Sequence, residues 1–298
     1  MSAAEVEVTG VAVVPRRRRS GPVRQVIARS LRMGRMQVGL TLFVALLLLA
    51  LIGPYFAPAK PTDLIGIPYG PSPHSMFRTD HLGEDVLSRF LWGGRSVFAL
   101  TTLATTLGVG LGIAVGLVAA YARGRLDDVL MRTMDVILSF PQIVLTLVAA
   151  ATVGPSLTLL VLTIGLTTMP RTARVVRGSA LEIVERDFVR ATQAIGESRV
   201  RILLGEILPN ILSPLLVEIS LRYTYTIGLI AGLSFLGFGL QPPAADWGLM
   251  INENRLGIQS APWAVALPVL AIAILTISTG LIGDALSRAV SGVDRGKD

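Results

Sequence analysis

Long apolar runs constrain this chain more than any other feature of its sequence. Several of them reach the length of about 20 residues that an α-helix needs to cross a bilayer. Of the 298 residues, 52% are hydrophobic and 16% are charged, whereas globular chains carry about 25% charged residues. The mean hydropathy is +0.64. The sequence therefore predicts an all-α, polytopic membrane protein rather than one or two soluble domains.

The apolar runs predict six membrane-spanning helices. Pro141 lies inside the third span and predicts a kink there, and residues 84–95 predict a separate interfacial helix that leads into the second span. Residues 1–35 are polar and are expected to be mobile. The expected spans cover residues 38–56, 97–121, 129–153, 156–176, 211–236 and 263–286.

These spans divide the chain into four expected regions. They are a basic N-terminal segment (1–35), the first span with an extracytoplasmic loop (36–96), a core of five spans (97–290) that contains a polar loop (184–209), and a tail (291–298).

The net charge of +7 is distributed unevenly along the chain. Of the 27 basic residues, 22 fall in segments that the spans place inside the cell, and basic residues accumulate on that side of membrane proteins. The arginine block at Arg16–Arg19 is therefore interpreted as a topology anchor, in preference to a tail that binds DNA or lipid. We expect both termini in the cytoplasm, contact with membrane lipid and no nucleic-acid partner. The five basic residues placed outside are Lys60, Arg78, Arg89, Arg95 and Arg255.

Residues that could carry catalysis are sparse. A nucleotide-binding P-loop needs a lysine in G-x-x-x-x-G-K-[ST], and neither Lys60 nor Lys297 has that context. The chain has no cysteine and no G-x-S-x-G elbow. Two histidines and three acids gather near residue 80 without a metal-ligand spacing. We expect no catalytic residue, no metal and no cofactor in this chain, so that any energy comes from another subunit.

The segment from Val184 to Pro209 is amphipathic and lies between two apolar runs. Its apolar residues recur at helical spacing, which predicts a helix, a turn and a second helix. Gly196 is the expected break, because glycine tolerates φ > 0 at a helix end. Ser198 is the expected N-cap of the second helix, and Pro209 is expected to end that helix or to start the next element. The predicted apolar faces are Val184, Phe188, Ala191 and Ile195, then Val200, Leu203, Leu204 and Ile207.

This helical hairpin is too short to cross a membrane, so it must lie at a surface. One interpretation is that it presents a charged face to a partner in the cytoplasm. The other is a basic loop that rests on anionic lipid. The residues alone leave both interpretations open.

Other features within the spans suggest packing or a polar pathway. Glycines at positions 108, 112 and 116 predict a ridge that lets another helix approach closely. Arg132 and Asp135, and Glu218 and Arg222, are spaced to pair on one helix face; such pairs either line a pathway or lock helices together. Trp247 and Trp263 are expected as interface anchors. The pathway or gate candidates are Asp135, Glu218, Arg222, Gln241 and Trp247.

Three parts of the chain resemble one family. The hairpin is similar to the EAA loop of ABC-importer permeases through Ala191, Gly196, Leu208 and Pro209. It departs from that loop at Arg190, Thr192 and Glu206, where Glu, Ala and Ile are usual. The run TD-LG-DVLSR at 79–89 and the run LSFLGFGLQPPAADWG at 233–248 resemble the peptide-importer branch. From about residue 74 to 290, the chain looks like the C-type permease of dipeptide and oligopeptide importers.

The resemblance implies specific site residues. In that family the loop docks into a cleft of the ATP-hydrolysing subunit. The implied coupling residues are Asp187, Phe188, Arg190, Ala191, Ala194, Gly196, Glu197, Ser198, Leu208 and Pro209. The implied extracytoplasmic motif consists of Asp80, Gly83, Asp85, Ser88 and Arg89.

The same resemblance implies a fold, a location and partners. The fold would be the type I ABC-importer permease fold, in a bacterial inner membrane. The partners would be a B-type permease, one or two ATP-binding subunits that hold ATP and magnesium, and an extracytoplasmic substrate-binding protein. Alternating access would carry di- or oligopeptides inward.

Other functions remain open at this point. Nickel importers share the architecture, and some peptide systems carry haem. An autonomous channel or secondary carrier is an alternative of another class, although secondary carriers are usually longer and show two related halves. An intramembrane enzyme would need paired catalytic groups, and the sequence displays none.

Overall fold

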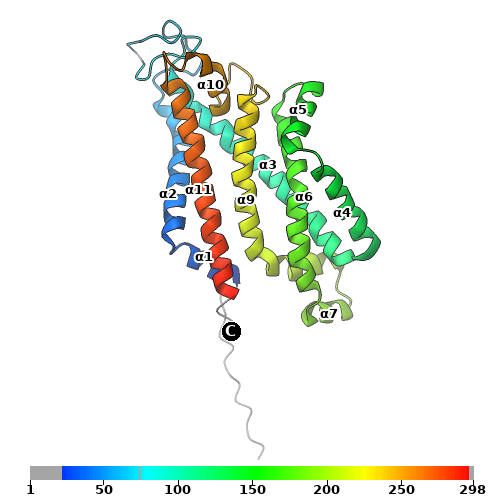
Figure 1. The fold of residues 1–298 in the computed structure, drawn as a ribbon. Coiled ribbons are helices and arrows are strands. Elements are labelled where there is room, and N and C mark those ends of the chain that lie inside the picture. Colours follow the sequence, from blue (N-terminus) through cyan, green and yellow to red (C-terminus); the bar gives the residue numbers. More distant parts are fainter. Residues whose placement is uncertain (1–21, 74, 295–298) are drawn as a thin grey trace, which may run out of the picture.

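The computed structural model describes residues 22–73 and 75–294, which form a bundle of long helices (Figure 1). Its longer elements are α2 (Gly34–Ile52), α3 (Val86–Ala122), α4 (Gly124–Leu138), α5 (Gln142–Val153), α6 (Leu157–Val184), α9 (Leu208–Phe235) and α11 (Trp263–Asp294). The short elements are α1 (Pro22–Ser30), η1 (Gly53–Phe56), α7 (Asp187–Ala194), α8 (Arg199–Arg201), the π-helical turn η2 (Ile202–Ile207), α10 (Trp247–Asn254) and η3 (Arg255–Gly257).

Among the described residues, five helices are long and apolar enough to cross a membrane. A sixth crossing results if α4 and α5 form one broken span, because the two helices meet at an angle of 76°. Pro141 stands at the N-cap of α5. Proline lacks a backbone N–H and disfavours helical geometry in the residue before it, so the predicted kink is a complete break. This result confirms the all-α membrane fold.

Helix α3 corrects the prediction of a separate interfacial helix at 84–95. It is one helix of 37 residues, and the Asp85 side chain caps its start by accepting a bond from the Ser88 backbone N–H at 2.8 Å. Gly93 and Gly94 do not interrupt it, because Trp247 packs directly on both. At 1.5 Å per residue the helix is about 55 Å long, which exceeds a hydrocarbon core of about 30 Å. Accordingly, α3 crosses the bundle diagonally (Figure 1).

The N-terminal segment is more ordered than the sequence predicted. Residues 22–30 form α1, and Val26 of this helix is buried against Ala285 and Ala289 of α11. Burial of Val26 therefore orders residues 22–30, although the polar sequence of this segment predicted mobility. Residues 1–21, which include Arg16–Arg19, and residues 295–298 lie outside the described residues.

The predicted glycine ridge is confirmed as the contact between α3 and α6. A Cβ atom on Gly112 would lie 2.6 Å from the Thr172 Cβ atom, and one on Gly116 would lie 2.6 Å from the Ala173 carbonyl oxygen. Gly108 meets the same helix one turn earlier. The two backbones therefore approach more closely than any larger residue allows.

The two ends of the bundle differ in structure. Helices α1 and α7 lie at the end where α11 finishes, and α5 and α10 lie at the opposite end (Figure 1). The first and last described residues thus lie at the same end, as an even number of crossings requires.

Candidate functional site

A helical hairpin projects from the bundle between α6 and α9, as the sequence predicted (Figure 1). Helix α7 ends at Ala194, and Gly196 turns the chain with φ of +83°. The Ser198 hydroxyl caps the second arm by accepting a bond from the Arg201 N–H at 3.4 Å. Arg201 also pairs with Glu197 at 2.5 Å. The roles of Gly196 and Ser198 in the hairpin are therefore confirmed.

The buried face of the hairpin differs in part from the predicted apolar faces. Val184, Val189, Ile202 and Ile207 form its core, whereas Ala191 is exposed. The first arm turns its Val189 face inward, one position after the predicted Phe188. As a result, four large apolar side chains face outward, with exposed fractions of 41% for Phe188, 79% for Ile195, 65% for Val200 and 56% for Leu204. Exposed apolar side chains on a segment outside the expected spans suggest contact with a partner.

Pro209 does not end the second helix of the hairpin, which was one of its two predicted roles. It lies at the start of the next element, which was the other. The π-helical turn η2 joins α8 directly to α9, so that Arg199–Phe235 is one span-length helix. Proline cannot donate the next backbone hydrogen bond, and π-helix, although rare, occurs mostly as a single turn of this kind within a longer α-helix. Leu208 and Pro209 therefore begin α9. Any displacement of the hairpin acts on a membrane-spanning helix without an intervening loop.

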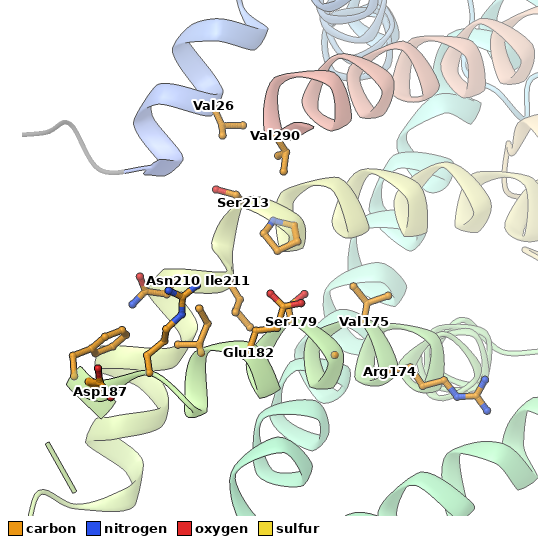
Figure 2. A pocket seen from close by; sticks show the side chains of 15 residues that line it. Val26, Arg174, Val175, Ser179, Glu182, Asp187, Asn210, Ile211, Ser213 and Val290 are labelled. Carbon is orange, nitrogen blue, oxygen red and sulfur yellow. The ribbon is translucent and has the colours of Figure 1, made fainter. Parts of the chain in front are cut away.

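A cavity of about 890 Å³ opens beside the hairpin, between α6 and α9. Figure 2 shows Glu182 on one wall, Asp187 and Asn210 at one end, and Val26 and Val290 on the far side. A smaller cavity of about 260 Å³ shares part of this wall and is lined by Glu218. The hairpin thus forms one boundary of the larger cavity, and the smaller cavity adjoins it at Val175, Pro214 and Val290.

The predicted pair of Glu218 and Arg222 is present. The Arg222 Nε atom lies 2.8 Å from Glu218 Oε1, and the Thr172 hydroxyl of α6 donates to the same carboxylate at 3.3 Å. Both charged side chains are largely buried. The pair therefore joins α9 to α6, and Glu218 also reaches the smaller cavity.

The predicted pair of Arg132 and Asp135 is wrong. Asp135 pairs with Arg174 of α6 instead, and Arg177 binds Asp127 of α4 through two bonds of 2.6 Å. Arginines on α6 reach across to α4 because the two helices pack side by side. Arg174 also lines the larger cavity, but Asp135 lines neither of the two cavities, so Asp135 is not placed with Glu218.

Two candidates at the other end of the bundle stabilise local structure. The Gln241 side chain donates to the carbonyl oxygens of Gly237 and Gly239, at 3.0 and 3.1 Å. Trp247 is fully buried, stacks on Phe90 and donates to its carbonyl oxygen at 2.9 Å. Trp247 is therefore neither an interface anchor nor a pathway residue, because its ring has no exposed surface. Trp263 is 46% exposed, as an anchor would be.

The motif near residue 80 forms a buried charged cluster. Arg89 contacts Asp80 at 2.5 Å, Glu253 of α10 at 2.9 Å, and Glu84. Asp80 Oδ1 also accepts three backbone N–H bonds from residues 82–84, and Gly83 has a φ of +96° against the Gly66 carbonyl. The motif residues thus build a junction between a loop, α3 and α10.

Burial changes the acidity of groups around this junction. It raises the pKa of Glu84 to about 7, against the opposing effect of Arg89. Burial likewise raises the pKa of Glu253 and of Asp246, whose carboxylate accepts a bond from Ser96 at 2.6 Å. The sequence did not indicate Glu253, because 164 residues separate it from Arg89.

These features define a helical, polytopic membrane protein with a projecting hairpin. Residues 112–292 match the family described as binding-protein-dependent transport system inner membrane component. The chain belongs to this family.

Curated relatives match along most of their length. A putative peptide transport system permease protein of Brucella suis is 36% identical and covers 89% of this chain and 90% of its own. The dipeptide transport system permease protein of Haemophilus influenzae is 34% identical over 85% and 88%. The glutathione transport system permease protein of Escherichia coli is also 34% identical, over 88% of each chain.

A solved structure of the MetNI methionine ABC transporter, in an inward-facing conformation, matches with a TM-score of 0.53. The identity is 20%, and the match covers 68% of this chain and 96% of that one. This likeness confirms the predicted fold of an ABC-importer permease.

Proposed function

We propose that this chain is the permease subunit of an ATP-driven importer of short peptides. It forms half of a pathway through the membrane and takes its energy from a separate ATPase. The observation that carries the proposal is the hairpin, whose apolar patch of Phe188, Ile195, Val200 and Leu204 lacks a partner within the described chain.

The hairpin connects an ATPase to the membrane-spanning helices in a direct manner. Asp187 and Arg190 are exposed on α7 and offer charges of both signs to a partner. The second arm continues into α9, whose Glu218 is bound to Thr172 of α6. A push on the hairpin therefore tilts α9 relative to α6 and changes the width of the cavity between them.

The assembly that follows has several members. An ATPase subunit binds ATP and magnesium and docks on the hairpin, a B-type permease supplies the other half of the pathway, and an extracytoplasmic binding protein delivers the cargo. The hairpin end of the bundle faces the cytoplasm, as the distribution of basic residues favours. Both termini then lie in the cytoplasm, and this chain needs no cofactor of its own.

The relatives favour a peptide as cargo. Peptide, dipeptide and glutathione systems are named among proteins 34–36% identical to this chain. Glutathione is itself a small peptide, so the three names share one chemical class.

Uptake and ATP hydrolysis by the assembled complex in proteoliposomes test the proposal. Proline fixes φ near −65° and cannot adopt the φ of +83° at Gly196. We expect Gly196→Pro to abolish ATP-dependent dipeptide uptake while the chain still inserts and hydrolysis by the complex continues. Charge reversal at Asp187 and Arg190 has the same expected effect.

The matched control is Gly205→Ala in the same hairpin. A Cβ atom there meets nothing closer than 3.9 Å, so uptake is expected to stay at the wild-type level. Normal uptake by Gly196→Pro in a fully assembled complex would contradict the role of the hairpin. Uptake by the wild-type chain alone, without ATP, would indicate an autonomous carrier instead.

A further inference from the structure

The charged junction at the α10 end of the bundle has an unusual balance of charge. One guanidinium, that of Arg89, is shared by Asp80, Glu84 and Glu253. Arg89, Asp80 and Glu84 are each at most 4% exposed. If all three acids were ionised, the cluster would carry a net charge of −2 out of contact with bulk water.

Such a charge is unfavourable in a buried site, where ionised groups lose hydration and repel one another. Uptake of one proton by a carboxylate relieves both effects. The Asp80 carboxylate already accepts three backbone N–H bonds. Glu84 lacks such donors among the hydrogen bonds of the described residues, and it is more deeply buried than Glu253. Of the three acids, Glu84 is therefore the best place for a proton.

We propose that Glu84 is a proton-binding site, and that the bound proton holds α10 against the start of α3. The junction joins three segments: Asp80 and Glu84 belong to the loop, Arg89 to α3, and Glu253 to α10. Loss of the proton adds negative charge beside Glu253. The repulsion is then expected to loosen α10, which packs on α9 and α11 as well.

Two other titratable groups of the same loop lie close to the cluster. The loop contributes His81, whose Nδ1 is 3.6 Å from Asp80 Oδ2 and has no hydrogen-bond partner among the residues that the structure describes. It also contributes Tyr69, whose backbone N–H donates to the Asp80 carbonyl oxygen at 2.9 Å. Proton uptake by Glu84 lowers the negative charge of the cluster as the pH falls. The junction should therefore tighten as the pH outside falls.

Infrared difference spectroscopy of the full chain in lipid nanodiscs tests the proton site. The C=O stretch of a protonated carboxyl group is recorded from about pH 5 to about pH 9, which brackets the pKa of about 7 for Glu84. We expect one band to disappear with a midpoint near pH 7. Glu84→Gln should lack this band, and the control Glu182→Gln, at the hairpin end, should retain it.

Spin labels test the mechanical part in the same preparations. The chain has no cysteine, so Leu82→Cys and Leu256→Cys, both exposed positions, can be labelled together. We expect the separation of the labels to increase above pH 7 in the wild-type background and to be independent of pH with Glu84→Gln.

Three results would overturn the proposal. The first is the absence of a titrating carboxyl band. The second is a band unchanged by Glu84→Gln, which would belong to another buried acid such as Asp246. The third is a normal titration with no change in label separation, which would exclude the effect on α10.

Discussion

The glycine ridge between α3 and α6 offers a sharp test of how this bundle is packed. The change is Gly112→Ala, which adds one methyl group at the contact. Its Cβ atom would lie 2.6 Å from Thr172 Cβ and 2.9 Å from the Met169 carbonyl oxygen, so the helices must separate. Overpacking of a tight contact costs about 1–3 kcal/mol, and replacement of a helical glycine by alanine returns up to about 1 kcal/mol.

The expected net loss is therefore about 0–2 kcal/mol of unfolding free energy, with a central value of about 1 kcal/mol. A loss of this size lowers the melting temperature by about 2–4 °C per kcal/mol in a chain of this length class. Thermal unfolding in detergent, followed by tryptophan fluorescence, measures it. Gly110→Ala is the matched control, because it lies on the same helix and its Cβ atom would meet nothing within 4 Å.

The control should be neutral or slightly stabilising, since only the gain in helix propensity remains. If Gly112→Ala and Gly110→Ala melted at the same temperature, the close contact between α3 and α6 would be refuted. A larger loss for Gly110→Ala would place the ridge on the wrong face of α3.

Three further predictions concern other contacts. Arg177→Ala removes the doubly bonded pair with Asp127 and should lower the unfolding free energy by about 1–3 kcal/mol, with Arg177→Lys retaining part of it; equal melting of all three chains would contradict this. Trp247→Phe removes the bond that the indole N–H donates to the Phe90 carbonyl oxygen, which should cost about 0.5–1.5 kcal/mol in thermal unfolding while dipeptide selectivity stays unchanged. Because the pKa of Glu84 is raised from 4.5 to about 7, its stabilising contribution is complete below pH 4.5 and is lost as pH rises through 7. The loss is on the order of 3 kcal/mol, and Glu84→Gln should flatten this part of the stability profile in chemical unfolding measured at each pH.

Features that depend on local chemistry could be predicted from the sequence. Pro141 breaks the third span, Gly196 turns the hairpin and Ser198 caps its second arm, because each acts on its own backbone. The membrane spans and the glycine ridge on α3 could be predicted for the same reason, because each is a pattern within a single helix.

Features that depend on contacts between distant segments could not be predicted. Asp135 has Arg132 nearby in sequence but pairs with Arg174, since the packing of α4 on α6 decides the partner. Tryptophan is a residue type typical of interface anchors, yet Trp247 lies in the core because Gly93 and Gly94 leave room for its ring. The contact between Glu253 and Arg89 could not be predicted either, because it forms only when α10 packs beside the start of α3.

The central claim is that an ATPase docks on the hairpin, and photo-crosslinking tests it most directly. A photoreactive amino acid at Ile195, which is 79% exposed in the hairpin, is compared with one at Leu256, which is 88% exposed near the opposite end. In the assembled complex, position 195 should capture the ATP-hydrolysing subunit, and position 256 should not. Capture of that subunit at position 256 alone, or at neither position, would contradict the account.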